Sequence, residues 1–326
     1  MMTRKEKALW TLYGAALFLL FLLSSTDLII KEKERQIYGI SVIIEDTSDE
    51  NYVNFRKGMD RAAMELHGDV SFITLYDKGS VKQQEEFILR EQQDGSRALI
   101  VSPVDAAEVL AMQEDKRINV PLILLNSEIA PAGDGITERI GFDYYQMGQE
   151  LGAQIVADTA LDGNRKKQVF LFGEADPVSE RFRDGILEEL EEAEYEAVFW
   201  EESRASLKEA VAKVAEKRGE QLVMAALDPM SLTEMCQLLS DIGTENKMVK
   251  LYGRGTSVRL LNYLDKGVIQ GLCITDDFSA GYLSVKMAVD LAENRIVEDM
   301  EYLESRCIRR EDLRDVEFEK MLYPIE

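Results

Sequence analysis

Histidine and cysteine are scarce in this chain. Among its 326 residues there is one histidine, His67, and there are three cysteines, Cys236, Cys273 and Cys307. The cysteines show no C-x-x-C spacing, so neither a zinc site nor an evident disulfide framework is indicated. Cys236 falls in a helix pattern and Cys273 in an apolar strand, and we expect both to be buried thiols. Because His67 stands alone at a predicted helix end, a histidine-based catalytic triad or metal site is not expected.

Basic residues are fewer than acidic residues in this chain. The chain has 38 Lys and Arg against 61 Asp and Glu, a formal net charge of −23. A nucleic-acid partner requires a basic face, and this balance argues against one. The motifs G-x-S-x-G, G-x-x-x-x-G-K-[ST] and H-E-x-x-H are absent as well. Gly253-Arg254-Gly255 resembles half of a dinucleotide fingerprint, but Val258 stands where the third glycine belongs.

One long apolar run is present near the N-terminus. Ala8–Thr26 contains no charged residue and follows a basic stretch. As a helix it would span roughly 28 Å at about 1.5 Å per residue, close to the hydrocarbon thickness of a bilayer. A cleaved signal peptide has a shorter apolar core and a small-residue cleavage site, which Ser24–Asp27 matches only weakly. We therefore expect an uncleaved signal anchor in residues 1–36, a single transmembrane helix that leaves the rest of the chain outside the cell membrane. Cleavage is the alternative.

Beyond the apolar run, strand-like and helix-like segments alternate. Strands separated by helices of this length are typical of βαβ crossovers and of parallel sheets covered on both faces. There are too many strands for one sheet, and a second series begins near Val169, so two doubly wound lobes are predicted. The predicted strands are Tyr38–Ile44, Val70–Leu75, Ala98–Val101, Pro121–Leu125, Arg139–Phe142, Val169–Phe172, Tyr195–Trp200, Leu222–Leu227, Met248–Tyr252 and Ile269–Thr275.

Polar and aromatic side chains follow many of these strands. In doubly wound sheets, ligands bind beyond the carboxyl ends of the strands. Any one of these residues could instead be a helix cap, as Asp49, Ser179 and Asp228 illustrate, or part of a turn. Together they predict one cleft between the lobes that suits a small hydroxylated ligand. The loops concerned hold Glu45–Tyr52, Asn126–Glu128, Gly173–Asp176 with Arg181 and Arg183, Asp228-Pro229, Gly253–Ser257 and Thr275–Asp277.

Several segments, taken in order, carry a family resemblance. The chain resembles the type I periplasmic binding protein superfamily, specifically its sugar-binding branch that includes ribose-binding protein, over roughly residues 37–295. The segments are YGISVIIEDTSDENYVNFRKGMDRAAMEL; ALIVSPVDAAEV and VPLILLNSEI, which match I-I-x-x-P-x-D and I-P-V-I-x-x-[DN]; IGFDYYQMGQELGAQIV with its paired glycines; and SERFRDGI, with an arginine a turn before a glycine.

This resemblance implies two Rossmann-like lobes joined by a three-crossover hinge, with closure on a ligand in the hinge cleft. Lobe 1 would hold residues 37–140 with about 276–295, and lobe 2 residues 141–275. The tail, residues 296–326, would return across the hinge. Carried over from the family, the pocket would include Asn51, Tyr52, Asn126 and Arg181, with Arg183 as the alternative arginine. With the strand-end loops added, the predicted ligand-binding residues are Asn51, Tyr52, Asn126, Arg181, Arg183, Asp228, Arg254, Thr275 and Asp276.

Four positions depart from the sugar-binding pattern. Leu227 stands near a usual asparagine, Arg254 replaces an aspartate that binds hydroxyls, Thr275 replaces a glutamine or asparagine, and Ser127 replaces a second arginine. These departures argue against a plain pentose or hexose. Arg254 could instead bind a carboxylate or phosphate, since its fork matches such groups, or be a surface residue.

The sequence thus favours an extracytoplasmic solute-binding protein that closes around a small polar, sugar-like ligand and needs no cofactor. Its partner would be an ABC permease or a membrane sensor histidine kinase. One alternative is a magnesium-dependent hydrolase or phosphoryl-transfer enzyme that uses Asp46, Asp49 and Glu50. Another is the effector core of a repressor, although no helix-turn-helix precedes it and an apolar segment does.

Overall fold

The computed structural model describes residues 3–25, 37–45, 52–127, 137–161, 167–200, 222–242, 249–297, 302–315, 318 and 321–323. The chain divides into two compact units, Met1–Ile37 and Tyr38–Glu326. The first unit holds helix α1 (Arg4–Ser25), whose sequence opens with the charged residues RKEK. Across the described residues, no helix combines the length and the apolar composition needed to cross a bilayer. The transmembrane anchor predicted within residues 1–36 is therefore not supported by the structure.

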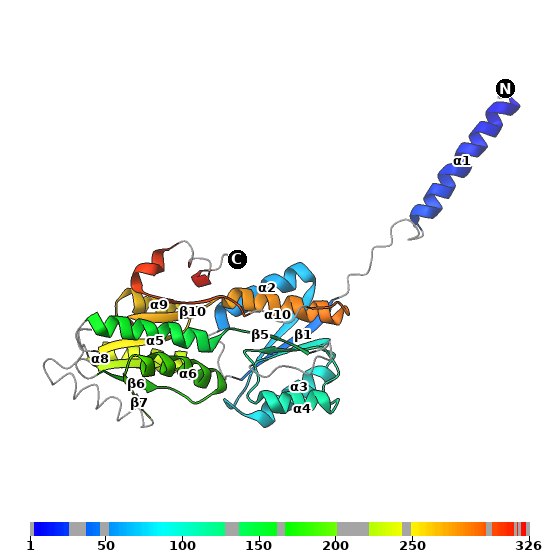
Figure 1. The fold of residues 1–326 in the computed structure, drawn as a ribbon. Helices are drawn as coiled ribbons and strands as arrows, with labels where there is room; N and C mark the ends of the chain where they lie inside the picture. Colours follow the sequence, from blue (N-terminus) through cyan, green and yellow to red (C-terminus); the bar gives the residue numbers. More distant parts are fainter. Residues whose placement is uncertain are drawn as a thin grey trace. The chain divides into compact units, whose positions relative to one another are not determined.

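The second unit begins with a parallel sheet in the order β2-β1-β3-β4-β5. Its inner strands are buried and apolar along their length because helices cover both faces. In Figure 1, α3 and α4 lie on one side of β1 and β5, and α2 and α10 lie on the other. The elements are β1 (Tyr38–Ile44), α2 (Val53–Leu66), β2 (Gly68–Thr74), α3 (Val81–Gln93), β3 (Ala98–Val101), α4 (Ala106–Glu114), β4 (Leu122–Leu125), β5 (Thr137–Ile140) and α10 (Asp277–Ala292).

A second sheet has the order β11-β10-β9-β8-β6-β7, and within it β11 alone among the described strands runs antiparallel, against β10. Its helices also cover both faces: in β8, Val223 and Ala225 pack toward α5 and α6, whereas Met224 and Ala226 pack toward α8 and α9. The elements are α5 (Tyr144–Leu161), β6 (Gln168–Phe172), α6 (Pro177–Glu192), β7 (Glu196–Phe199), β8 (Leu222–Ala226), α8 (Pro229–Ile242), β9 (Val249–Arg254), α9 (Val258–Asp265), β10 (Gly271–Thr275), β11 (Ser305–Ile308) and a 3₁₀ helix (Arg310–Arg314).

The chain passes between the two sheets at three places that lie side by side. The first is the segment from β5 to α5, the second joins β10 to α10, and the third leads into β11. Leu303 forms a parallel bridge with Phe142 and donates its N–H to the Gly141 carbonyl at 3.0 Å. The Asp276 N–H donates to the Glu304 carbonyl at 3.1 Å. The predicted α/β fold with two lobes is confirmed. The lobe boundaries, residues 37–140 with 276–295 and residues 141–275, stay a proposal.

Close glycine contacts hold one helix pair in each lobe. A Cβ on Gly58 of α2 would stand 1.9 Å from the Phe278 carbonyl oxygen of α10, and one on Gly281 would meet the Phe55 carbonyl at the same distance. Helices α5 and α6 repeat this arrangement: a Cβ on Gly148 would stand 2.1 Å from the Phe182 carbonyl oxygen. These helix pairs approach so closely only because the residues at the crossing have no side chain.

A disulfide joins Cys273 of β10 to Cys307 of β11. This corrects the expectation that Cys273 is a buried thiol. The two cysteines stand directly opposite each other in the antiparallel pair of strands, a register that the sequence did not reveal. Cys236, by contrast, is a free and buried cysteine, as predicted, and its burial raises the pKa of the thiol to about 12.

Candidate ligand-binding site

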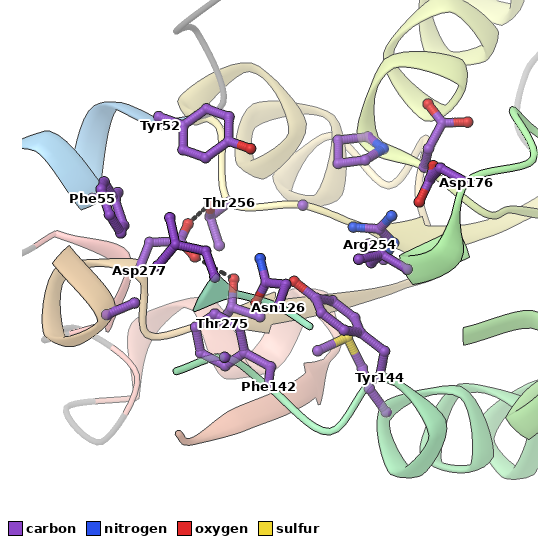
Figure 2. Close-up of a pocket in the computed structure, with 18 of the residues that line it drawn as sticks. Tyr52, Phe55, Asn126, Phe142, Tyr144, Asp176, Arg254, Thr256, Thr275 and Asp277 are labelled. Atoms are coloured by element: carbon purple, nitrogen blue, oxygen red, sulfur yellow. Dashed lines mark hydrogen bonds between the residues drawn. The ribbon is translucent and has the colours of Figure 1, made fainter. Parts of the chain in front are cut away.

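A cavity of about 170 Å³ opens where the carboxyl ends of strands from both sheets face each other. Pockets for drug-sized ligands measure about 300–1,000 Å³, so this cavity suits a smaller molecule. Its wall combines aromatic rings with carboxylates, hydroxyls, an amide and two cations, several of which Figure 2 shows. The polar and aromatic lining residues are Glu45, Tyr52, Phe55, Lys78, Asn126, Phe142, Tyr144, Asp176, Asp228, Arg254, Thr256, Thr275 and Asp277.

Asp277, at the start of α10, is the carboxylate at the hinge end of the cavity. It accepts hydrogen bonds from the Thr275 hydroxyl at 2.6 Å and from the Thr256 hydroxyl, and Figure 2 draws both. Burial raises the pKa of Asp277 to about 6, and the two threonine hydrogen bonds lower it only in part. A half-buried carboxylate with lone pairs left over is an acceptor for a ligand hydroxyl or amine.

Arg254, at the end of β9, is fixed in place by neighbours on several sides. Its Nε donates to the Leu227 carbonyl at 2.8 Å and its Nη2 to the Ser179 hydroxyl at 3.3 Å. The guanidinium carbon lies 5.2 Å from the ring centroid of Tyr144 and 5.8 Å from that of Phe182. Hydrogen bonds and cation–π contacts therefore hold the cation against the cavity wall.

Two aspartates line the cavity as helix caps. The carboxylate of Asp176 accepts from the Ser179 N–H at 2.9 Å and from the Ser179 hydroxyl at 2.7 Å, at the N-terminus of α6. The carboxylate of Asp228 accepts from the Ser231 N–H at 2.8 Å and from the Glu174 N–H at 2.9 Å, before α8. These bonds satisfy donors at the helix ends.

Aromatic rings form the apolar part of the wall. Tyr52 and Phe55 meet edge to face with centroids 6.0 Å apart, and so do Phe142 and Tyr144 at 6.1 Å. The Tyr52 hydroxyl donates to Glu45 at 3.2 Å. Burial raises the pKa of the Tyr144 hydroxyl well above its usual range. Flat rings beside hydroxyl and carboxylate groups suit the mixed faces of a small hydroxylated molecule.

Asn126 follows β4 in a left-handed backbone conformation, with φ of 53°. Asparagine tolerates this region better than most residues. Its N–H donates to the Ile140 carbonyl at 2.8 Å. A Cβ on Gly141 would stand 2.7 Å from the Asn126 Oδ1, so this glycine is what lets the amide lie at the cavity.

At the rim, one ion pair connects loops of the two sheets. The Lys78 ammonium, after β2, lies 2.7 Å from a carboxylate oxygen of Glu174, after β6. Both side chains are partly exposed, so the pair is worth about 0–1 kcal/mol.

Five of the predicted ligand-binding residues line the cavity: Tyr52, Asn126, Asp228, Arg254 and Thr275. Three lie outside its lining. The Arg181 guanidinium lies 4.4 Å from the Tyr145 ring centroid, Arg183 pairs with Asp184, and Asp276 caps α10 through the Ser279 N–H. Asn51 lies outside the described residues, as do Asp46, Asp49 and Glu50. Within the described residues, no cluster of three or more His, Cys, Asp or Glu could hold a metal ion.

Sequence reasoning missed several lining residues. Asp277 is the chief of them, because Asp276 was chosen as the ligand contact from the same loop. Glu45 and Asp176 lie in two of the strand-end loops named above, but they are not among the predicted ligand-binding residues. Tyr144 and Phe142 flank the crossing segment, where aromatic residues between a strand and a helix gave the available signal.

The sequence of this chain matches one known protein family over most of its length. The sequence profile of the family described as "Periplasmic binding protein domain" matches residues 40–296. No curated protein matches the chain in sequence.

Solved structures share the fold at low identity. GanP, a glucose-galactose binding protein from Geobacillus stearothermophilus, is 17% identical with a TM-score of 0.70, over 86% of this chain and 99% of that one. An ABC transporter solute-binding protein from Agrobacterium vitis, bound with alpha-D-tagatopyranose, is 16% identical with a TM-score of 0.73, over 88% and 100%. A chain of the TorS sensor domain–TorT complex, solved without ligand, is 16% identical with a TM-score of 0.70, over 88% and 98%.

Proposed function

Because the chain belongs to the periplasmic binding protein domain family, we propose that it closes around a small sugar-like ligand in the cleft between its two sheets. The observation that carries the proposal is the cavity itself, whose walls come from strand ends of both sheets beside three crossing segments. A ligand that contacts both walls favours the closed arrangement over an open one. Closure requires that the ligand prefer that arrangement by a few kcal/mol.

The character of the lining supports a hydroxylated ligand. Asp277 and Asn126 offer acceptors and donors, and Tyr52 and Phe142 offer ring faces. Solved structures of the same fold carry D-allose, D-arabinose and alpha-D-tagatopyranose. These sugars belong to those proteins. For this chain they supply the first compounds to test.

The bound form would serve one of two membrane partners. An ABC permease would take the ligand up, whereas a sensor histidine kinase would read the closed shape. Solute-binding proteins of ABC transporters and the TorS–TorT complex both occur among the similar structures, and they illustrate these two roles. Deletion of the gene separates the roles: loss of ligand uptake indicates transport, and loss of a ligand-dependent transcriptional response indicates sensing.

An extracytoplasmic location fits the family and the disulfide. Disulfides persist in oxidising compartments, and Cys273–Cys307 is such a bond. Anchoring by the apolar run Ala8–Thr26 is the part of the proposal that rests on sequence alone. Extraction of cell membranes at alkaline pH tests it: an anchored chain stays with the lipid, and a chain that is released contradicts the anchor.

The first experiment is a thermal-shift screen of the full-length protein against monosaccharides, sugar acids, sugar phosphates and polyols. At a ligand concentration of 100 times Kd, binding adds about 2.7 kcal/mol, a shift of a few degrees. Small-angle X-ray scattering of any hit should show a smaller radius of gyration than the ligand-free protein. If no compound changes stability or shape, the proposal is wrong.

Members of the family are binding proteins rather than enzymes, and the magnesium-dependent enzyme is not favoured. The three acidic residues on which it rested, Asp46, Asp49 and Glu50, lie outside the described residues. Magnesium-dependent turnover of a generic phosphoester by the purified protein would revive that alternative.

A further inference from the structure

Arg254 has binding capacity that the protein's own contacts leave unused. A guanidinium carries five N–H donors, and the two hydrogen bonds to Leu227 and Ser179 occupy Nε and one position on Nη2. Among the described residues, Arg254 forms no ion pair, and its Nη1 makes no hydrogen bond. The residue nevertheless lines the cavity. Donors that face a cavity without a partner are available to a ligand.

The guanidinium is also held ready for that role. Its hydrogen bond to the Leu227 carbonyl and its cation–π contact with Tyr144 fix its position before any ligand arrives. An ordered side chain loses little further freedom on binding, so more of the interaction contributes to affinity. The planar fork matches a carboxylate in two parallel hydrogen bonds.

Two aspartates of the cavity wall, Asp176 and Asp228, form hydrogen bonds to groups other than Arg254. Both oxygens of Asp176 accept from Ser179. The oxygens of Asp228 accept from the Ser231 N–H in the first turn of α8 and from the Glu174 N–H in the loop after β6. These hydrogen bonds come from neutral donors, and neither aspartate forms an ion pair with Arg254. Among the described residues, no carboxylate forms an ion pair with Arg254; the charge of this arginine acts on Asp277 from a distance and opposes the rise in the pKa of that carboxyl.

At the other end, Asp277 is an acceptor. In Figure 2, Asp277 and Arg254 lie on opposite sides of the labelled group, with Asn126 and the ring of Tyr144 drawn between them. Thr256 and Thr275 already donate to Asp277, so their hydroxyl hydrogens are used there. A ligand group next to Asp277 must therefore bring its own donor, as a hydroxyl does.

We propose that the cavity selects a hydroxylated carboxylic acid, such as a sugar acid, over the corresponding neutral sugar. Arg254 binds the carboxylate, and Asp277 accepts a hydrogen bond from a ligand hydroxyl. This inference rests on the proposed function and names the class of its ligand.

A carboxylate suits the cavity better than a phosphate does. The cavity of about 170 Å³ also has Glu45, Asp176 and Asp228 on its wall. Attraction by Arg254 and Lys78 and repulsion by the carboxylates both double for a doubly charged phosphate. Because the carboxylates on the wall outnumber the two cations, the net opposition is larger for a phosphate than for a carboxylate.

Isothermal titration calorimetry of the full-length protein at pH 7.5 tests the inference with matched pairs. The probes are D-galacturonate against D-galactose, D-glucuronate against D-glucose, and D-glucose 6-phosphate. At least one uronate should bind tenfold or more tightly than its neutral partner, and its affinity should fall as salt rises. If the neutral sugar of each pair binds as well or better, or if the phosphate binds most tightly, the inference is wrong and the proposed function stands. If none of the five binds, the inference is overturned, and the broader screen decides the proposed function separately.

Variants of the arginine identify the contact. Arg254→Gln should weaken uronate binding at least tenfold and change binding of a neutral sugar less than twofold, and Arg254→Lys should fall between. Arg259→Gln removes the same charge from the exposed face of α9 and should leave both affinities unchanged. Unchanged uronate affinity in Arg254→Gln would overturn the assignment. Should that variant fail to fold, the matched pairs on the wild-type protein still decide.

Discussion

Replacing Asp277 with asparagine should stabilise the ligand-free protein increasingly as pH rises. Burial raises the pKa of this carboxyl from 3.8 to about 6 in the folded state. A rise of that size corresponds to about 3 kcal/mol between the two protonation states, at 1.36 kcal/mol for each pH unit. The ionised carboxylate therefore costs the apo fold about 3 kcal/mol near neutral pH, a cost that asparagine does not carry.

The sign follows from where the proton is held. Below pH 3.8 the carboxyl is protonated in both the folded and the unfolded chain. Between pH 3.8 and 6 the folded protein keeps the proton and the unfolded chain loses it. The stability that this proton contributes is fully present below pH 3.8 and is lost as pH rises through about 6. Relative to the wild type, the variant should thus gain about 2 kcal/mol between pH 4 and pH 7. Its altered hydrogen bonds to Thr256 and Thr275 add an offset that does not change with pH.

Urea unfolding of both proteins at half-unit steps from pH 4.0 to 7.5 measures this difference. Asp290→Asn is the matched control, because its pKa moves in the opposite direction. Burial opposes the ionised form of Asp290, but hydrogen bonds from Lys286 and Arg295 outweigh it and lower the pKa. Asp290 titrates at or below pH 3.8 in both the folded and the unfolded chain, so the difference between that variant and the wild type should stay nearly constant over this range. A difference between Asp277→Asn and the wild type that stays constant across the range would refute the reasoning.

Three further predictions concern covalent, packing and ionic contacts. Cys307→Ser opens a loop with a sequence separation of 34 and should lower the free energy of unfolding by about 4 kcal/mol in urea titrations. Gly58→Ala would place a Cβ 1.9 Å from the Phe278 carbonyl oxygen and should lower the free energy of unfolding by about 1–3 kcal/mol or more, measured as a lower Tm. Gly39→Ala is its control: the nearest atom to the new Cβ lies 3.7 Å away, so this variant should be nearly as stable as the wild type. Lys78→Ala removes the ion pair to Glu174 and should enlarge the apo radius of gyration in scattering at low salt, as high salt should for the wild type.

The strands and the division into two sheets could be predicted because apolar runs of four to seven residues recur between amphipathic helices. Predicted and observed strands differ mainly at their ends, as with Val70–Leu75 against Gly68–Thr74 and Tyr195–Trp200 against Glu196–Phe199. Strand ends depend on hydrogen bonds to neighbouring strands, and a single sequence does not show these bonds. The last strand, Ser305–Ile308, was not placed because an antiparallel edge strand does not follow the βαβ pattern.

The site could be predicted in outline because parallel strands bring their carboxyl ends to one edge. That argument placed Tyr52, Asn126 and Arg254 at the cavity, where the structure has them. It failed to separate Asp276 from Asp277. Asp276 caps α10, whereas Asp277 lines the cavity. These two roles are set by the residue at which α10 begins.

The rotation of α6 about its axis explains why Arg181 and Arg183 do not line the cavity. The helix packs against α5 through Gly185, and this directs Arg181 toward Tyr145 and Arg183 toward Asp184. Such rotation is set by tertiary packing, which the sequence of the helix does not reveal.

The Cys273–Cys307 bond also changes how the second unit would carry mechanical load. A pull applied at Tyr38 and Ile308 would run through the first sheet, cross Gly141–Asp143, and then pass from β10 through sulfur into β11. The disulfide bypasses residues 274–306, which include all of α10, so this segment would carry no tension. The covalent chain would bear tension at one crossing while the other two stay relaxed, so α10 would remain seated on α2 until the first sheet itself gives way.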